Sequence, residues 1–358
     1  MMLLELNFEK SWRGGERQTL YNMTGFRQAG MEVHLLCRKG KPLEAMAREA
    51  NFTVHSFGNI LGVIFFLLSK GHRYKLMHVQ TSQLLTYAVF LKPFHRAKVV
   101  FSRRVNFIPK GFFTRMKYLY ADALVAVSNS VKNILQDFTN KNDILLIPDI
   151  VVKKDWNAET QVDLFDGLNI TGKKIVASTA ALTPEKAPLI SLEAAYLLMK
   201  EREDILFLHF GDGPLMEEIQ QQIKKYKIED RYLLMGHVKN VEQYFSKFDV
   251  FVITSNNEGL CSSVLDAFVY RVPVVATQAG GLADLIQPDR AFACETGNAV
   301  MIADGIIATL NEPEQTNIRI ENAYNFAMEN YSMQKVTNQY LQLFSTLLKQ
   351  PVTAWKQL

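Results

Sequence analysis

The chain has 358 residues, which is enough for two domains, because one domain usually holds about 100–200 residues. Hydrophobic residues make up 48% of the sequence and charged residues 21%, a composition that excludes a disordered chain, a collagen-like repeat and a coiled coil. The formal net charge is +4. The three cysteines form no CxxC pair, which excludes a disulfide scaffold and a zinc ribbon and suits a reducing compartment.

Short apolar runs alternate along the chain with longer amphipathic stretches. The runs predict strands over Leu3–Leu6, Glu32–Cys37, Leu76–Val79, Lys98–Phe101, Ala123–Val127, Ile144–Ile147, Lys174–Thr179, Ile205–Phe210, Tyr232–Met235, Val250–Thr254 and Val272–Ala276. Stretches between them predict helices, among them Leu189–Lys200, Pro214–Lys225 and Ser262–Tyr270. Strand–helix alternation at this spacing is typical of parallel sheets with right-handed crossovers.

The alternation starts again after a polar, non-periodic segment, Lys153–Gly172, which we interpret as the interdomain linker. We therefore predict an α/β protein with two doubly wound, Rossmann-like domains, 1–155 and 156–334. A C-terminal helix near 335–358 is expected to pack back on the first domain. Two such domains side by side would turn the carboxyl ends of their strands toward a central cleft.

The longest apolar run, Ile60–Leu68, has nine residues, whereas a membrane span needs roughly 20. The N-terminus becomes acidic and polar within five residues, which does not fit a signal peptide. We therefore expect a cytoplasmic protein. A buried helix is the favoured use of the apolar run, and an amphipathic membrane contact is the alternative.

Charge is distributed unevenly between the two halves. Residues 1–155 hold 23 Lys and Arg against 11 Asp and Glu, and the remainder holds 17 against 25. The 72 positions between Glu49 and Asp122 contain no acidic residue but eleven Lys and Arg, interleaved with Phe and Tyr. Such a stretch suits nucleic acid, an anionic membrane face or a phosphorylated substrate, and the alternative is a solvated surface on which positive charges cluster.

Three turns at the ends of predicted strands are candidates for phosphate contact. Gly14 and Gly15 precede a helical stretch that begins near Glu16, where backbone N–H groups would be open to an anion. Lys186 follows one strand as a point charge, and Gly211 and Gly213 follow another. Taken singly, each of these is more often an ordinary turn or a solvated lysine.

The segment from Val250 to Leu285 is the most informative. Glu258 lies in a loop after a strand, and the following residues lead into a helix that carries Asp266. The eight-residue spacing places the two carboxylates about two turns apart at one end of that helix, with backbone N–H groups between them to cradle an anion. Two carboxylates around an anion site suit a ligand with hydroxyls on both sides of a diphosphate, as in a nucleotide sugar.

This segment resembles the E-x7-E signature of the retaining glycosyltransferases of family 4, which have the GT-B fold, although the second carboxylate here is Asp266. The resemblance follows most of the chain in order. It covers Gly14–Glu16, Ala121–Asn129, Leu182–Lys186, Gly211–Leu215, Ser255–Asp266 and Pro273–Gly281.

The resemblance implies a role for each matching residue. Asp266 would bind the ribose hydroxyls, Glu258 the hydroxyls of the donor sugar, and Lys186 the leaving diphosphate. Backbone N–H groups at the donor would come from Gly259, Leu260 and Cys261, with Gly211 on the same side and Gly15 closing from the first domain. No metal and no other cofactor is implied.

Two departures from the family pattern concern the cations. Where the family usually has an arginine, five residues before the lysine, this chain has Ala181. Arg103 or Arg104 is the candidate replacement, and binding of an acceptor phosphate, or a place in the basic surface, is an equal alternative for both. The family also often has a histidine after the fourth or fifth strand. His78 fits the former place, but the latter carries Arg103 and Arg104.

The resemblance implies a hexosyltransferase that moves a sugar from a nucleotide-sugar donor to a glycan or lipid-linked acceptor, with retention and without a metal. Synthesis of a cell-surface polysaccharide or of lipopolysaccharide is the expected context. The basic first half predicts a peripheral contact with an anionic membrane surface, and no nucleic-acid partner is expected. A nucleotide-sugar epimerase and a non-catalytic glycosyltransferase-like subunit are the alternatives, and among histidines only His78 and His209 suit the epimerase.

Overall fold

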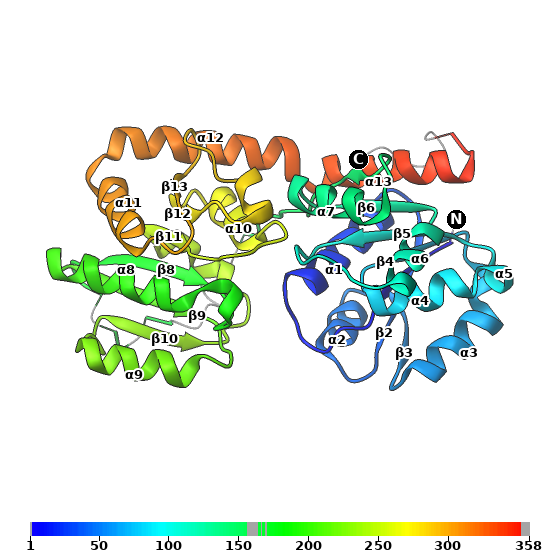
Figure 1. Cartoon of the computed structure of the whole chain (residues 1–358), viewed down its shortest axis with the longest axis horizontal. Coiled ribbons are helices and arrows are strands. Elements are labelled where there is room, and N and C mark those ends of the chain that lie inside the picture. Colours follow the sequence, from blue (N-terminus) through cyan, green and yellow to red (C-terminus); the bar gives the residue numbers. More distant parts are fainter. Residues whose placement is uncertain (1, 156–163, 166, 169, 352–358) are drawn as a thin grey trace. The chain divides into compact units, whose positions relative to one another are not determined.

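The computed structural model describes residues 2–155, 164, 165, 167, 168 and 170–351 and divides the chain into two units (Figure 1). Unit 1 combines the chain up to Ile150 with the chain from Asn330 onward, and unit 2 is Val151–Glu329. The division lies five residues before the predicted one. Half of the predicted linker, Lys153–Gly172, lies outside the described residues, namely 156–163, 166 and 169.

Unit 1 is built on a seven-stranded parallel sheet with the order β3-β2-β1-β4-β5-β6-β7. The strands are β1 (Met2–Asn7), β2 (Glu32–Arg38), β3 (Thr53–Phe57), β4 (Leu76–Val79), β5 (Lys98–Arg103), β6 (Ala123–Ala126) and β7 (Leu145–Leu146). The order reverses direction at β1 and β4. In an open α/β sheet, ligands bind beyond the carboxyl ends of the strands next to such a reversal.

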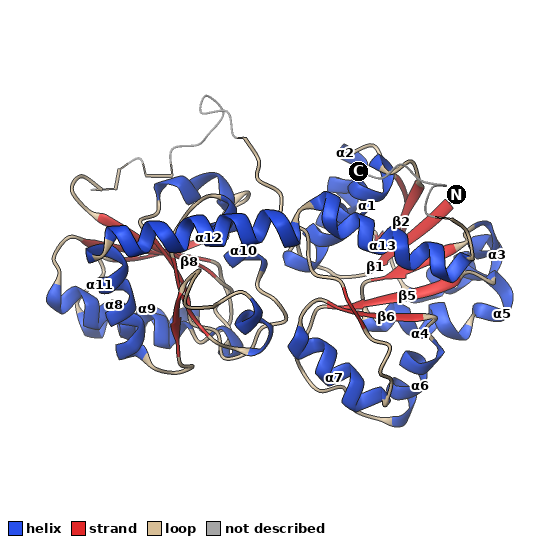
Figure 2. Cartoon of the chain, turned by 90° about the horizontal axis from the view of Figure 1, so that it is seen from above, coloured by secondary structure: helices blue, strands red, loops and turns tan. Residues whose placement is uncertain are grey.

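Helices lie on both sides of this sheet, with α1, α2 and α13 on one side and α4, α6 and α7 on the other (Figure 2). The α-helices are α1 (Gly14–Gln28), α2 (Pro42–Glu49), α3 (Ile60–Lys70), α4 (Ser82–Phe90), α5 (Lys92–His95), α6 (Phe112–Tyr120), α7 (Asn129–Thr139) and α13 (Met333–Leu348), with a 3₁₀ turn η1 (Gly71–Arg73). The last helix packs against α1, as expected for the C-terminal helix. Gly25 permits this close approach, because a Cβ there would lie 2.1 Å from the Thr337 hydroxyl oxygen.

Unit 2 is built on a six-stranded parallel sheet with the order β10-β9-β8-β11-β12-β13. The strands are β8 (Lys174–Thr179), β9 (Ile205–Phe210), β10 (Tyr232–Gly236), β11 (Val250–Ile253), β12 (Val274–Thr277) and β13 (Phe292–Cys294). The helices are α8 (Pro188–Glu201), α9 (Met216–Tyr226), α10 (Ser262–Val269), α11 (Ala299–Asn311) and α12 (Pro313–Tyr331), with 3₁₀ turns η3 (Pro184–Lys186), η4 (Val241–Lys247) and η5 (Gly280–Asp284). Two parallel sheets, each covered by helices, form the two Rossmann-like domains of a GT-B fold.

Each predicted strand corresponds to an observed one, because buried strands of a parallel sheet are continuous apolar runs. Two strands were missed, β3 and β13. Both lie at sheet edges, and β3 alternates polar residues such as His55 with apolar ones.

The apolar run Ile60–Leu68 forms helix α3, as favoured, but the helix is only partly buried. Leu61 and Phe65 are each 72% exposed, whereas Val63, Phe66 and Leu67 face the core. Among the described helices, α3 included, none combines the length and apolar character that a bilayer span requires.

Candidate functional site: the strand ends of unit 2

A lysine and a glutamate from two neighbouring loops meet at the carboxyl edge of the unit 2 sheet. Lys186 ends the turn after β8, Glu258 lies in the loop after β11, and β8 and β11 are adjacent strands. Lys186 Nζ donates to Glu258 Oε1 over 2.6 Å, and Ser255 Oγ donates to the same oxygen over 2.7 Å. Burial alone would lower the pKa of Lys186, but the adjacent Glu258 carboxylate raises it, so the ammonium is retained.

Backbone and hydroxyl hydrogen bonds join the loops that carry this pair. Asn256 N donates to Glu185 O over 2.8 Å, and Thr254 Oγ1 donates to Ala187 O over 3.0 Å. The third loop, after β12, is joined by the Thr277 hydroxyl, which donates to Ser255 O over 2.6 Å. Three strand ends are therefore held together, so that the Lys186–Glu258 pair has a fixed place before any ligand binds.

The second predicted carboxylate, Asp266, lies inside helix α10 and is buried. Glu258 lies in the loop before the helix, as predicted, and only the residues from Ser262 to Asp266 between the two carboxylates are helical. The break is at Cys261, whose φ of 78° is in the left-handed region and starts the helix at Ser262. The residues between them thus form a turn that leads into α10.

Gly259, Leu260 and Cys261 make up this turn, and Leu260 is buried. Burial raises the pKa of the Cys261 thiol to about 12, so the group stays protonated near neutral pH and is a poor nucleophile. An unreactive thiol agrees with the expectation that Cys261 contacts the donor through its backbone N–H group and not through its sulfur.

Gly211 is required by a close backbone approach. Its φ is 139°, and a Cβ there would lie 2.1 Å from Ala180 O at the end of β8. Its N–H donates to Gly236 O over 2.7 Å and is therefore occupied within the fold. Gly211 thus brings the loop after β9 against the loop that contains Ala181, while the predicted contact with the donor stays a prediction.

In unit 1, Gly15 lies within the first turn of α1, not before the helix as predicted. The helix begins earlier because the Glu16 carboxylate accepts from Arg13 N over 2.9 Å, which caps the first turn. No heavy atom lies within 4 Å of a Cβ placed at Gly15, so packing does not explain the glycine.

His78 is enclosed in unit 1 and does not reach the surface. Its Nδ1 is hydrogen-bonded to Glu5 Oε1 and its Nε2 to Ser102 Oγ, both over 2.7 Å. Ser102 is in turn hydrogen-bonded over 2.8 Å to the hydroxyl of Tyr340, on α13. These hydrogen bonds link β1, β4, β5 and the C-terminal helix. The expectation that His78 is a catalytic residue in contact with the substrate is therefore wrong, because its side chain is fully buried.

The two arginines after β5 are both engaged within unit 1. Arg103 is only 1% exposed, donates to the Tyr118 hydroxyl over 2.7 Å and donates to Phe107 O. Burial gives Arg103 no access to a diphosphate, so its predicted role as the replacement cation is wrong. Arg104 is 12% exposed at its side chain and pairs with Asp149 over 2.7 Å. Burial lowers the Arg104 pKa, but the pairing with Asp149 outweighs it and raises the pKa.

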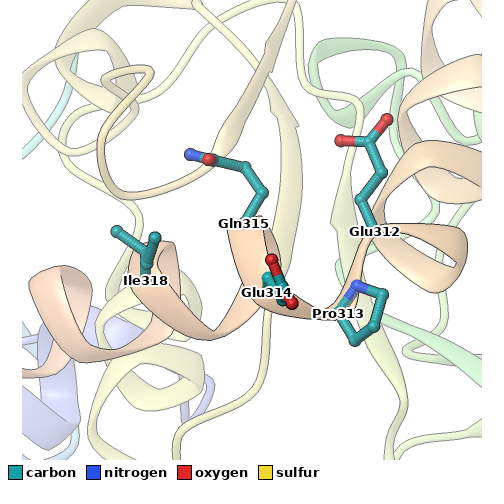
Figure 3. A pocket seen from close by; sticks show the side chains of 5 residues that line it. All are labelled: Glu312, Pro313, Glu314, Gln315 and Ile318. Carbon is teal, nitrogen blue, oxygen red and sulfur yellow. The ribbon is translucent and has the colours of Figure 1, made fainter.

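A surface hollow at the start of α12 is lined by Glu312, Pro313, Glu314, Gln315 and Ile318 (Figure 3). Two of these residues are carboxylates and none is a cation, which does not suit a diphosphate. Within the described residues, no group of three or more His, Cys, Asp or Glu side chains is placed to hold a metal ion.

Sequence reasoning missed Ser255, Thr254 and Thr277, which hold the loops of the site in place. Their hydroxyls follow strands β11 and β12 directly, and this position at a carboxyl strand end was the available signal. The contacts themselves depend on which strands are neighbours, which the sequence does not state.

Comparison with known proteins gives matches on both units. The family model "Glycosyltransferase Family 4" matches residues 12–151, and the model "Glycosyl transferases group 1" matches residues 161–326. N-acetyl-alpha-D-glucosaminyl L-malate synthase of Bacillus anthracis is 26% identical over 64% of this chain and 61% of that protein, less than two thirds of its length. Alpha-monoglucosyldiacylglycerol synthase of Streptococcus pneumoniae is 24% identical over 79% of this chain and 69% of the relative. The crystal structure of Anabaena HepE in complex with UDP-glucose superposes with a TM-score of 0.84 at 18% identity, covering 97% and 100% of the two chains.

Proposed function

This chain belongs to the family 4 glycosyltransferases of GT-B fold, and from that premise we propose that it transfers a hexose from a nucleotide-sugar donor, with retention, to a lipid-linked or glycan acceptor. The observation that carries the proposal is the Lys186–Glu258 pair at the joined strand ends of unit 2. The lysine of the pair can bind a diphosphate, and the glutamate can accept hydrogen bonds from sugar hydroxyls.

Donor binding would separate the pair, with Lys186 moving to the diphosphate and Glu258 to the sugar hydroxyls. Asp266, nearby in sequence on α10, would take the ribose, and the turn at Gly259–Cys261 would offer its N–H groups to the diphosphate. Lys186 and these N–H groups supply the charge stabilisation that a metal supplies elsewhere, so we propose a metal-independent reaction.

The transfer itself needs no protein nucleophile. The acceptor hydroxyl oxygen forms the new bond to the anomeric carbon, and the bond to the diphosphate oxygen breaks with its electron pair remaining on the diphosphate. The acceptor proton passes to that same leaving diphosphate on the same face of the sugar. Lys186 stabilises the charge that develops there, and the anomeric configuration is kept.

A panel of nucleotide sugars with a panel of acceptors tests this proposal. We expect one donor to be turned over, with NMR of the product showing the anomeric configuration of the donor. Turnover with an inverted product would overturn the mechanism, and donor epimerised without transfer would favour the epimerase. Donor bound without turnover with any acceptor would favour the non-catalytic subunit. The burial of both His78 and His209 speaks against the epimerase, which needs an accessible acid or base.

The acceptor side of the proposal is that unit 1 docks on an anionic membrane leaflet to reach a lipid-linked acceptor, in cell-surface polysaccharide or lipopolysaccharide synthesis. The exposed Leu61, Phe65 and Leu68 on α3 are available for contact with the membrane. Phe94 on the neighbouring α5 is 60% exposed and is available in the same way. These side chains belong to the stretch without carboxylates, residues 50 to 121, which contains eleven Lys and Arg. Near an anionic leaflet each cation contributes about 1 kcal/mol, so a few contacts suffice for reversible binding.

Sedimentation with liposomes tests the docking. Binding is expected to rise with the fraction of anionic lipid and to fall with salt. Equal, negligible binding to neutral and anionic vesicles at low salt would overturn it and favour a soluble phosphorylated acceptor.

A further inference from the structure

The segment Val105–Phe113, which leads from β5 into α6 and includes the first two residues of that helix, presents an unusual number of apolar side chains to solvent. We call it the apolar loop. Its exposed members are Val105, Phe107, Ile108, Phe112 and Phe113. The last two are 70% and 79% exposed, and their rings contact each other with centroids 5.8 Å apart. Exposed apolar side chains gathered this closely usually mark a surface that meets a ligand or partner.

The fold holds this loop in its shape from inside. Arg103, buried beneath it, donates to Phe107 O and to the hydroxyl of Tyr118 on α6, and its guanidinium lies 4.8 Å from the Phe107 ring centroid. Ser130 Oγ donates to Asn106 Oδ1 over 2.7 Å, which ties the loop to α7. The fold therefore fixes the loop at Asn106 and Phe107, just before the two exposed rings at the start of α6.

This arrangement has a cost in stability. Arg103 is almost fully buried, and no carboxylate forms an ion pair with it among the described residues. Burial accordingly lowers its pKa, because the charged form loses its hydration. Neutral hydrogen-bond partners replace only part of that hydration, so a guanidinium held in this way costs more than a neutral side chain of the same shape would.

The position of the loop and its charge indicate what binds there. It follows the carboxyl end of β5, at the edge of the sheet where open α/β domains bind their ligands. Lys110 within the loop is exposed, and no carboxylate occurs in the sequence between residues 50 and 121. An apolar surface with positive charge beside it suits a hydrocarbon chain that carries a negatively charged group.

We propose that the apolar loop binds the hydrocarbon chain of a lipid-linked acceptor at its junction with a phosphate. This inference rests on the proposed function, whose acceptor it specifies. It differs from the docking of α3, because α3 would contact the surface of the bilayer, whereas the loop would take a single chain.

The two probes are decyl phosphate, below its critical micelle concentration, and propyl phosphate. They share the phosphate and differ in the hydrocarbon chain, so comparing their affinities gives the contribution of the chain. Binding to the full chain is measured by calorimetry, without membranes and without a sugar donor. The loop variant Phe112→Ser/Phe113→Ser removes two exposed rings. The matched control, Val300→Ser/Ile318→Ser, removes two exposed apolar side chains from helices α11 and α12 of unit 2.

We expect decyl phosphate to bind the unaltered chain at least about tenfold more tightly than propyl phosphate does, since apolar burial scales with chain length. The loop variant should lose about tenfold in affinity, and the unit 2 control should bind as the unaltered chain does. Equal affinity for the two probes, an unaffected loop variant, or equal losses in both variants would each overturn the inference. The binding measurement contains no sugar donor, so it does not depend on sugar transfer. The proposed lipid site and the proposed transfer reaction can therefore fail separately.

Discussion

The two units use the same architecture but place their charged groups differently. In unit 2, Lys186 and Glu258 meet in loops beyond the strand ends, where a ligand can separate them. In unit 1, Glu5 and His78 lie within the strands and are wholly buried, and Arg103 is enclosed behind them on β5. An ionisable side chain in a loop at a strand end can bind a ligand, whereas one enclosed within the sheet is occupied by its neighbours in the fold. This difference supports the proposal that the donor binds at unit 2 and that the acceptor binds at the surface of unit 1.

The largest expected effect comes from Glu258. Glu258→Gln should lower kcat by about a thousandfold, because the amide cannot accept from the donor hydroxyls as a carboxylate does. The thermal unfolding midpoint should stay close to that of the unaltered chain, since the loops are also held by backbone hydrogen bonds. Asp266→Asn is expected to act in the same direction. Steady-state kinetics with saturating donor measure both, and turnover near the unaltered level in both variants would contradict the assignment.

Substitution of the buried Arg103 in unit 1 should instead lower stability. Arg103→Ala is expected to lower the free energy of unfolding by about 3–4 kcal/mol, because it leaves Phe107 O and the Tyr118 hydroxyl without their donor and opens a cavity. Denaturant unfolding measures the loss. Adding Ala181→Arg should restore neither stability nor kcat, since Ala181 belongs to unit 2 and Arg103 supplies no charge there. Rescue of kcat by Ala181→Arg would show that the two positions serve one phosphate.

A buried histidine should make unit 2 sensitive to acid. Burial lowers the pKa of His209 to about 4, below the value of about 6.5 that it has when unfolded. The unfolded chain therefore binds the proton first, and stability present above pH 6.5 is lost as the pH falls toward 4. The loss should approach about 2–3 kcal/mol at pH 4. Chemical unfolding between pH 7 and 4 should show a flatter profile for His209→Gln, and identical slopes would rule out this origin.

The smallest expected effect is that of metal removal. If Lys186 and the turn before α10 hold the diphosphate, excess EDTA should leave kcat within the error of the assay, and added Mg²⁺ should not raise it. A loss of more than about tenfold on chelation, restored by a divalent cation, would mean that the lysine does not replace a metal.

The sequence predicted most strands of both sheets because each is an apolar run. It missed β3, in which polar and apolar residues alternate, and β13, which has only three residues. It also indicated Lys186, Glu258 and Asp266 as site residues. It could not show that Lys186 and Glu258 are paired, because that depends on the adjacency of β8 and β11, strands separated by two others in the chain. Nor could it distinguish Arg103 from Arg104. Successive residues at a strand end point in opposite directions, so one is buried against α6 and the other pairs with Asp149.

The most direct test of the account is the equilibrium binding of nucleoside diphosphates to the unaltered chain and two lysine variants. Lys186→Met removes the cation at the proposed site, and Lys174→Met removes a half-exposed lysine that pairs with Asp249 at the other end of the same strand, β8. The account predicts that one diphosphate binds, that Lys186→Met weakens it by at least about tenfold, and that Lys174→Met leaves it unchanged. Equal affinities in all three proteins, or no binding of any nucleoside diphosphate, would contradict the central claim.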